Sequence, residues 1–579
     1  MRASLLVAAL ASTFLYSAAP ALAGDPIMPL SQLRSGMQCT GYSVIRGTAV
    51  TSFDVEILDV VSGDSSANEG PRILVRVSGP AVDETGIGPG FSGSPIYCQN
   101  ADGTYGNAGA ISESIGEYGG KVVLATPIEA ILGNQPDAPA AKPVPASAGP
   151  IRPLAAPLTV SGLSRPLSQA LTRAGKKAGR QVLDAPAAPL APFPVTAPTP
   201  GSAMSVGYST GDLSIGAIGT VAYVDGDRVW GFGHPFENSG LRSLLLQDAY
   251  VYRIIDNPSA GGDQGTTYKL AGVGHPIGTI SNDASAAVVG RWGALPPLVP
   301  VRVFSSDLDT GDQRTLTTRV VDETGVGTPT GGSALSFVGP LAIAQAASAI
   351  LRSAPGKLTG EMCLRIVLRE RRTPLRVCNR YVSGSALPEE NGATNVVALG
   401  AAADALQALS MIDEYKRSDL HVTELSARLR LRRGQLQAFM RSVKLPRRVR
   451  AGQRVRARMT LQVVRGPRLT RTFTVRIPSV RPGTRRLTFR GSDLDDPESD
   501  IFGALVTTLT IGEDEDEPPA GDPGPASVEE LAARIKRIAR YDGVIVRASG
   551  GNYARAYRDP EVRISGQVST SVRVLRKRR

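Results

Sequence analysis

The sequence predicts a mainly β protein that is divided into several domains. Its 579 residues include 63 glycines and 43 prolines, whereas aromatic residues make up only 5%. Runs of β-branched and alternating residues recur between these glycines and prolines, for example over 53–61 and 72–77. Short strands joined by tight turns have this composition. At about 150 residues for each domain, the length allows for three or four domains.

The first residues have the pattern of a secretory signal peptide. Arg2 precedes an apolar run over 5–19, and Ala21 and Ala23 place small residues where signal peptidase needs them. We expect residues 1–23 to be removed and the mature chain to lie in the cell envelope or the extracellular space. An uncleaved N-terminal anchor is the alternative. No transmembrane segment is expected after removal of the signal, because the later apolar stretches are too short.

Beyond the signal peptide, composition and hydrophobic alternation divide the chain into six segments. They are a strand-rich unit (24–136), Pro/Ala-rich linkers with a short helix (137–202), a second strand-rich unit with a cysteine hairpin (203–385), a helix with a β-sandwich (386–512), an acidic Pro-rich linker (513–526), and a C-terminal helix with a basic tail (527–579).

The four cysteines form two plausible pairs. Cys363 and Cys378 lie at mirrored positions of a predicted hairpin, so they face each other across its two strands, and Cys39 and Cys98 remain to pair. Disulfides persist outside the cytoplasm, and the longer loop would stabilise the fold by about 4 kcal/mol. We expect neither a metal nor another cofactor, because there is no Cys-x-x-Cys and the three histidines lie far apart.

The formal charge of +12 is concentrated late in the chain, where arginines crowd residues 428–490 and 573–579. A basic surface can attract an anionic polymer of the cell envelope. The simpler explanation is a solvated face of the β-sandwich, and the sequence favours it because no aromatic residues interleave with the charges. For the same reason we expect no nucleic acid partner.

Residues 88–96, Gly-Pro-Gly-Phe-Ser-Gly-Ser-Pro-Ile, have the form of a nucleophile turn. An uncharged serine attacks a carbonyl only with a base beside it and donors for the developing oxyanion. In the Gly-x-Ser-Gly turn of chymotrypsin-like peptidases, the turn itself supplies these donors. We therefore predict Ser92 as the nucleophile and the N–H groups of Gly90 and Ser92 as the oxyanion hole. An ordinary glycine-rich turn is the alternative, whereas an α/β-hydrolase elbow would need glycine at Ser94.

The flanks of this turn resemble SpoIVB-type serine peptidases. Residues 53–57, 84–86 and the turn are similar to the Ser-containing half of that family, with Phe91 in place of its methionine. Residues 214–221 and Gly233-His234 are similar to the His-containing half. The resemblance covers about half of the mature chain, and it implies two chymotrypsin-like β-barrel halves.

The resemblance also implies that His234 is the general base for Ser92. His275 follows a similar Gly-x-Gly-His-Pro pattern and is the competing candidate, whereas His421 is expected to be structural. The Ser half precedes the His half here, which is the reverse of the family order and implies a circular permutation. Catalytic triads are defined by geometry and not by chain order, so this order does not exclude activity.

The catalytic acid is left open, because the family's position aligns with Gly79, which has no carboxylate. Asp83 is the nearest substitute, and Asp54 and Asp225 are alternatives. Loss of the acid alone costs a serine peptidase about 10⁴-fold in rate. The sequence thus predicts a secreted serine endopeptidase that cleaves a narrow protein substrate or itself. The alternative is a weak or inactive peptidase fold that binds envelope polymers or proteins.

Overall fold

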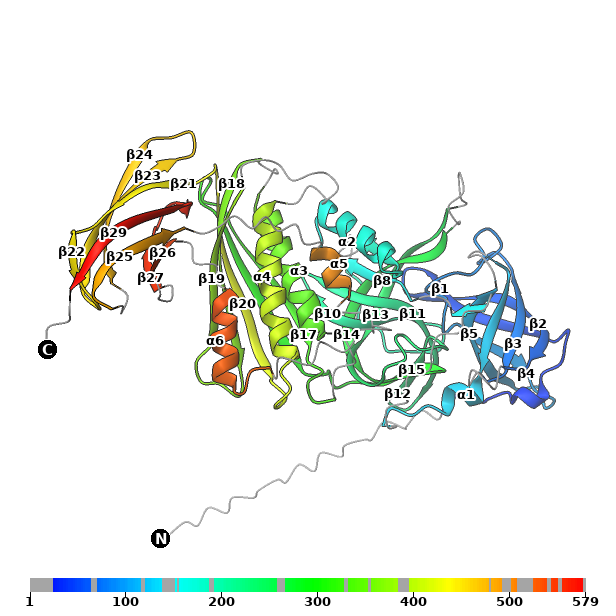
Figure 1. Ribbon diagram of the computed structural model, residues 1–579. Helices are drawn as coiled ribbons and strands as arrows, with labels where there is room; N and C mark the ends of the chain where they lie inside the picture. Colours follow the sequence, from blue (N-terminus) through cyan, green and yellow to red (C-terminus); the bar gives the residue numbers. More distant parts are fainter. Residues whose placement is uncertain are drawn as a thin grey trace, which may run out of the picture.

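The structure, a computed structural model, confirms a mainly β protein, with 53% of its residues in strands (Figure 1). The expected signal peptide lies outside the described residues, as do most of the acidic linker and residues 576–579. The structure describes residues 24–63, 70–115, 120–137, 151–153, 156–186, 192–257, 266–326, 332–351, 356–383, 395–477, 481–491, 501–507, 524–538, 543–549 and 554–575.

The first strand-rich unit is a closed antiparallel barrel of six strands. Hydrogen bonds join the strands in the order β1-β2-β3-β6-β5-β4, and β4 pairs again with β1. The strands are β1 (Gln38–Arg46), β2 (Ala49–Val61), β3 (Arg72–Ser78), β4 (Pro95–Gln99), β5 (Tyr105–Ile115) and β6 (Val122–Pro127). The barrel closes because alternate residues of each strand are apolar and point into one core, as Val55 and Ile57 of β2 do.

The second strand-rich unit contains another ring of six antiparallel strands. They are β10 (Ala203–Gly211), β11 (Ser214–Asp225), β12 (Arg228–Gly231), β13 (Gly240–Asn257), β14 (Thr266–Ala284) and β15 (Ala287–Trp292). The pairings run β10-β11-β12-β15-β14-β13 and return to β10. Numbered along the chain, both rings have the order 1-2-3-6-5-4. The connection between the third and fourth strands therefore occupies the same place in both rings.

Further strands extend the second ring into a sheet of 13 strands. The additions on one side are β16 (Leu298–Asp307), β17 (Gln313–Val321), β18 (Leu358–Leu368), β19 (Leu375–Ser383) and β20 (Val422–Arg433). On the other side are β8 (Leu158–Ser161) and β9 (Val182–Ala185). The segment expected to be a linker thus supplies two strands to this sheet, and β20 belongs to it rather than to the sandwich.

Helices cover this extended sheet. They are α2 (Arg165–Lys177), α3 (Ala334–Ala349), α4 (Val396–Asp413), α5 (Ile501–Thr507) and α6 (Val528–Ile538). Among the described helices, α4 alone is long and apolar enough to cross a membrane, but most of it is buried in the protein. It packs against α3, β18 and β19, and its Asn395 cap accepts a hydrogen bond from Ala398 N. Burial against these neighbours accounts for its apolar composition.

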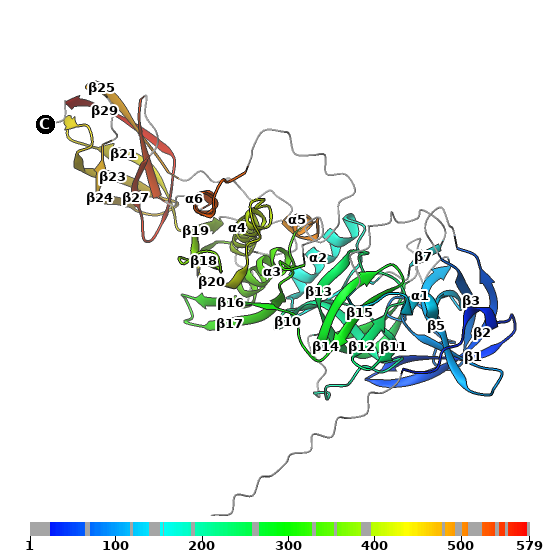
Figure 2. The same ribbon diagram turned by 90° about the horizontal axis from the view of Figure 1, so that it is seen from below.

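The C-terminal β-sandwich is larger than the sequence suggests. One sheet has the order β24-β23-β21-β28 and the other β22-β29-β25-β26-β27. Its strands are β21 (Gln437–Lys444), β22 (Arg448–Arg450), β23 (Arg454–Val463), β24 (Arg468–Arg476), β25 (Gly483–Arg490), β26 (Gly543–Ala548), β27 (Ala554–Arg558), β28 (Arg563–Ser565) and β29 (Gln567–Leu575). The expected boundary at 512 is therefore corrected, because the supposed basic tail contributes β26–β29. The sandwich and the first barrel lie at opposite ends of the molecule (Figures 1 and 2).

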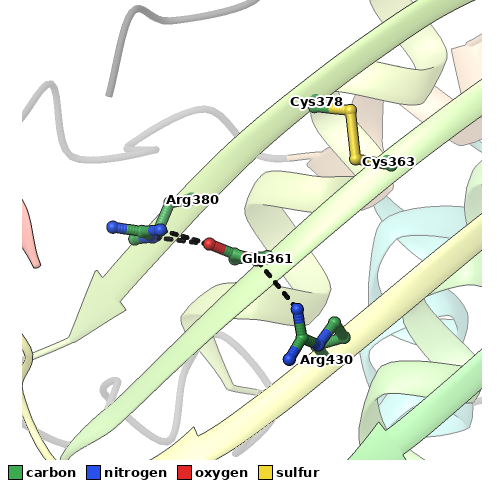
Figure 3. Close-up of a disulfide and its surroundings, with 5 residues drawn as sticks. All are labelled: Glu361, Cys363, Cys378, Arg380 and Arg430. Atoms are coloured by element: carbon green, nitrogen blue, oxygen red, sulfur yellow. Dashed lines mark hydrogen bonds and ion pairs between the residues drawn. A yellow bond between two sulfur atoms is a disulfide. The ribbon is translucent and has the colours of Figure 1, made fainter. Parts of the chain in front are cut away.

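The two predicted cysteine pairs are both present as disulfides. Cys39 and Cys98 join directly opposite residues of β1 and β4, and thus cross-link one pair of barrel strands. Cys363 and Cys378 do the same for β18 and β19 (Figure 3). The remaining short elements are η1 (Leu30–Gln32), α1 (Ile128–Leu132) and β7 (Ile151–Pro153).

The two six-stranded rings meet at the glycine-rich turn before β4. Ser92 O accepts a 2.8 Å hydrogen bond from Thr220 N of β11. Gly93 has a φ of +92°, and a Cβ there would lie 1.9 Å from Thr220 O and 2.6 Å from Phe232 N. Because both neighbours are backbone atoms, only glycine permits this close approach.

Gly93→Ala is accordingly expected to lower the free energy of unfolding by about 3 kcal/mol or more, from backbone strain plus the clash. The matched control is Gly36→Ala, because Gly36 also has a positive φ (+83°) but would meet nothing within 4 Å. The control should lose only about 1–2 kcal/mol. Thermal and denaturant melts compare the two, and equal losses would contradict a tight contact between the rings at Gly93.

Candidate functional site

Hydrogen bonds to its carbonyl groups fix the backbone of the turn that contains Ser92. Each carbonyl of residues 89–92 accepts a hydrogen bond, and the donors belong to Lys269, Thr220 and Ser94. The bonds are Lys269 N to Pro89 O (2.9 Å), Thr220 Oγ1 to Gly90 O (3.0 Å), Ser94 Oγ to Phe91 O (2.6 Å) and Thr220 N to Ser92 O (2.8 Å). Strands β11 and β14 of the second ring, together with Ser94 in the turn itself, therefore determine the shape of the turn.

The same arrangement orients the two amides predicted to form the oxyanion hole. In a trans peptide the N–H points away from the C=O of the preceding residue. The bonded carbonyls of Pro89 and Phe91 therefore direct the N–H group of Gly90 away from Lys269 and that of Ser92 away from Ser94. Neither N–H donates a hydrogen bond to any described residue. Gly90 has a φ of +95°, which favours glycine at this position. Two such preoriented donors are what a developing oxyanion requires.

Ser92 and His234 lie in equivalent connections of the two rings. Ser92 is in the connection from β3 to β4, and His234 is in that from β12 to β13. Both side chains are buried, with 0% and 3% exposure. Ser92 Oγ has no hydrogen-bond partner among the described residues. The structure therefore does not show a Ser92–His234 hydrogen bond, although it places both residues at the junction of the rings.

The carbonyl group of Ile111 lies close to both the Ser92 turn and the segment before His234. Ile111 O, in β5, accepts a 2.7 Å hydrogen bond from Gly93 N. The same oxygen lies 3.3 Å from where a Cβ on Gly233 would stand. Thr126 Oγ1 of β6 also donates a 2.7 Å hydrogen bond to Gly233 O. The first barrel thus contacts both the residue after Ser92 and the residue before His234.

The backbone just before His234 is strained. Phe232 and Gly233 have φ values of +69° and +70°, and Phe232 is fully buried. A bulky residue in this region costs about 1–3 kcal/mol, and such strain is concentrated at functional sites. His234 Nδ1 lies 2.6 Å from Pro235 O. Because a carbonyl only accepts, the neutral ring carries its proton on Nδ1, and Nε2 is the basic nitrogen.

Asp283, at the end of β14, holds the loop that follows His234. Its carboxylate accepts hydrogen bonds from Phe236 N (2.6 Å), Glu237 N (2.7 Å) and Ser239 N (3.3 Å). Burial raises the pKa of Asp283 to about 6, against the lowering effect of Arg242 and of the Phe236 and Glu237 N–H groups. The sequence analysis did not single out Asp283, because no motif surrounds it and its role depends on the pairing of β13 with β14.

A buried ion network continues from this loop. Arg242 Nη1 lies 2.6 Å from Glu237 Oε2, and Arg242 Nε lies 2.7 Å from Glu323 Oε1. Arg180 and Tyr208 also bind the Glu237 carboxylate, at 2.8 Å and 2.5 Å. Despite desolvation, the two arginines keep the pKa of Glu237 below its usual range. Removing one partner from such a network costs about 3–5 kcal/mol, because a charge remains buried without compensation. The His234 loop is thus held rigidly on its C-terminal side.

The three candidate acids have neighbours of their own in the structure. Asp83 is half exposed and forms a 3.2 Å ion pair with Lys121. Asp54 is exposed, and its Oδ2 lies 3.4 Å from where a Cβ on Gly79 would stand. Asp225 pairs with Arg228. The assignment of Asp83 therefore stays a prediction that this geometry does not favour.

The other two histidines have carboxylate partners on their Nδ1 atoms. His275 Nδ1 lies 3.0 Å from Asp248 Oδ2, and His421 Nδ1 lies 2.8 Å from Glu370 Oε1. Asp248 also accepts a hydrogen bond from Thr196 N, so it fixes the segment before β10 to β13 and β14. Both pairs have a structural explanation. The described residues contain no group of three or more His, Cys, Asp or Glu side chains that could hold a metal ion.

Lys269 of β14 is a buried amine directly beneath the turn. Its Nζ donates hydrogen bonds to Ser43 Oγ (2.6 Å) and Thr220 Oγ1 (3.1 Å), and it lies 4.5 Å from the centre of the Phe91 ring. Ser43 Oγ in turn lies 2.9 Å from Ser94 Oγ. Desolvation lowers the pKa of Lys269 to about 7. No sequence pattern indicated this residue, because only the fold brings it to the turn.

The buried amine predicts a specific dependence of stability on pH. The unfolded lysine keeps its proton up to about pH 10, whereas the folded one loses it near pH 7. Between these values the unfolded state binds more protons, so the free energy of unfolding rises with pH, by up to about 1.4 kcal/mol per unit. Lys269→Met should abolish this rise in denaturant titrations between pH 7 and 9. The exposed Lys121→Met should retain it, and an unchanged slope in Lys269→Met would contradict the titration of Lys269.

Comparison of the chain with protein-family models, with curated proteins and with solved structures finds no match. The chemistry of the site is therefore the basis for a functional proposal.

Proposed function

We propose that this chain is a secreted serine endopeptidase that resembles SpoIVB-type enzymes, with its two chymotrypsin-like halves in permuted order. The observation that carries the proposal is the preoriented pair of amides at Gly90 and Ser92, on the turn that also holds the serine. The equivalent positions of Ser92 and His234 in two rings of identical strand order support it further. An ordinary hairpin turn would need neither feature.

In the proposed reaction, Ser92 Oγ attacks a peptide carbonyl and His234 Nε2 accepts its proton. The amides of Gly90 and Ser92 stabilise the oxyanion of the tetrahedral intermediate. Protonated His234 then donates to the leaving amine, and an acyl-enzyme on Ser92 remains. Water, deprotonated by His234, releases the second product. No cofactor takes part.

Asp283 is the carboxylate that the geometry best connects with His234. It acts through the backbone, because it binds Phe236 N and Glu237 N next to the loop's His-Pro pair. It is therefore a positioning residue in this proposal, in place of an acid at Gly79. For Asp83 to act as the catalytic acid, its ion pair with Lys121 would have to break.

Burial of Ser92 supports a narrow substrate. With no exposed surface, its hydroxyl is reached only after neighbouring residues move, so an unselected peptide has little access. A protein substrate, or a segment of this chain, that displaces the covering residues would meet the requirement. The same proposal includes export of the protein to the cell envelope or the extracellular space.

One observation favours a second candidate function. Ser92 Oγ has no hydrogen-bond partner among the described residues, and the predicted acid Asp83 is paired with Lys121. Such a site matches a weak or inactive peptidase fold that binds envelope polymers or proteins. Hydrogen bonds of catalytic residues often shorten only when substrate binds, so reactivity rather than distance separates the two functions.

Labelling with a fluorophosphonate probe tests the nucleophile. Native protein should form a covalent adduct, and Ser92→Ala should not. Ser205→Ala is the matched control, because Ser205 Oγ is likewise buried with no hydrogen-bond partner among the described residues. Peptide mapping should place the adduct on Ser92. Equal labelling of native protein and Ser92→Ala would rule out this nucleophile.

The base is tested by comparing two histidines that share the Gly-x-Gly-His-Pro pattern. His234→Ala should slow labelling by about 10²–10⁴-fold, the usual contribution of a general base. His275→Ala should change it little, since His275 pairs with Asp248 in a structural contact. If native protein does not react under any condition that preserves its fold, the non-catalytic candidate is supported instead.

A further inference from the structure

The outer face of one sheet of the β-sandwich carries cations and hydroxyl groups but no carboxylate. Strands β21, β23 and β24 alternate buried and exposed residues, so one side packs into the core and the other faces solvent. The exposed residues of these strands, which form this arginine–threonine face, are Phe439, Arg441, Lys444, Arg454, Arg456, Arg458, Arg468, Thr470, Thr472, Thr474 and Arg476. Figures 1 and 2 show these strands at the end of the molecule remote from the barrels.

Like charges stand directly opposite each other on this face. Arg454 pairs in register with Arg476, and Arg458 pairs with Lys444. Cross-strand pairs of like charge destabilise a sheet. Within the described part of the chain, none of these four residues forms an ion pair with a carboxylate, and neither does Arg456. By contrast, Arg471 of β24 forms two, with Asp559 and Glu561. An external anion would relieve this repulsion.

A shallow hollow lies at the C-terminal end of β21, beside β23. It has a volume of about 360 Å³, and the cationic residues lining it are Lys444, Arg456 and Arg458, together with Thr472. Along β23 the exposed arginines recur at every second residue, which spaces them about 6.8 Å apart. A row of fixed cations with hydroxyl groups on the next strand fits a linear chain that carries repeated anions and sugar hydroxyls.

We propose that the arginine–threonine face binds an anionic polysaccharide, through charge-assisted hydrogen bonds from Arg456, Arg458 and Lys444 to its acidic groups. Arginine binds planar oxyanions with two parallel N–H bonds. The threonine hydroxyls of β24 supply partners for sugar hydroxyls. Phe439 is the one exposed aromatic residue on these three strands. Nucleic acid binding is disfavoured, because single strands are held by several aromatic side chains on which bases stack.

The test uses the full mature chain and immobilised polymers of defined chemistry. Dextran sulfate and polygalacturonate present sulfate and carboxylate groups, neutral dextran controls for the sugar, and poly(dT) is the nucleic acid. Both acidic polysaccharides should bind with an affinity that falls as salt rises. The double variant Arg456→Ser/Arg458→Ser should weaken this binding by about tenfold or more. Binding that is as strong to neutral dextran would overturn the proposal.

The chain offers a matched control on another strand. Arg430 and Arg432 of β20 have the same spacing and are also exposed, but Glu361 lies 3.9 Å from Arg430 (Figure 3). Arg430→Ser/Arg432→Ser removes the same charge and should leave affinity nearly unchanged. Equal losses in both double variants would show attraction by net charge alone and overturn the site. Tighter binding of poly(dT) than of either acidic polysaccharide would overturn the ligand class.

Polysaccharide binding at the arginine–threonine face does not depend on the proposed peptidase activity. The face lies outside both barrels, so binding is measured whether or not Ser92 reacts. Labelling of Ser92 in the arginine variants should equal that of the native chain. Thermal melts should show that both variants keep the fold, and loss of Arg458 opposite Lys444 should not lower stability, since it removes a repulsion between like charges. Failure of polysaccharide binding therefore says nothing against Ser92, and failure of labelling says nothing against the face.

Discussion

The site depends on hydrogen bonds that hold the carbonyls of residues 89–92 from beneath. Thr220 contributes its amide and its hydroxyl, and Lys269 contributes its backbone amide while its side chain holds Thr220 and Ser43. Because peptide units are planar, fixing the carbonyls also fixes the amides on the opposite side. The first barrel supplies the turn, and the second supplies its support. Neither ring alone defines the site.

The sequence predicts the local features of this protein well. Alternation of apolar and polar residues indicates the strands around Val55 and Val75, and the spacing of Cys363 and Cys378 about a turn indicates their pairing. Both inferences depend only on residues that are close in sequence. The glycines at 90 and 93 indicate a tight turn, because their positive φ values require that residue. These inferences need no knowledge of distant contacts.

Features that depend on distant pairing could not be predicted. Lys269 reaches the turn only because β14 passes under it, and Asp283 reaches the His234 loop only because β14 pairs with β13. The strands between 543 and 575 were expected to be a basic tail, because their arginines mask the short apolar alternation of Val544 and Val546. For the catalytic acid, proximity in sequence to Gly79 suggested Asp83, whereas the fold pairs that side chain with Lys121.

Each six-stranded ring returns to its own first strand, and this closure has an evolutionary consequence. Within the described residues, the contacts between the rings are turns, side chains and the isolated bridge between Gly47 and Val251, not a shared ladder. The order of the two units along a gene can therefore change without the loss of any strand pairing, provided that the new connecting segment is long enough to join them.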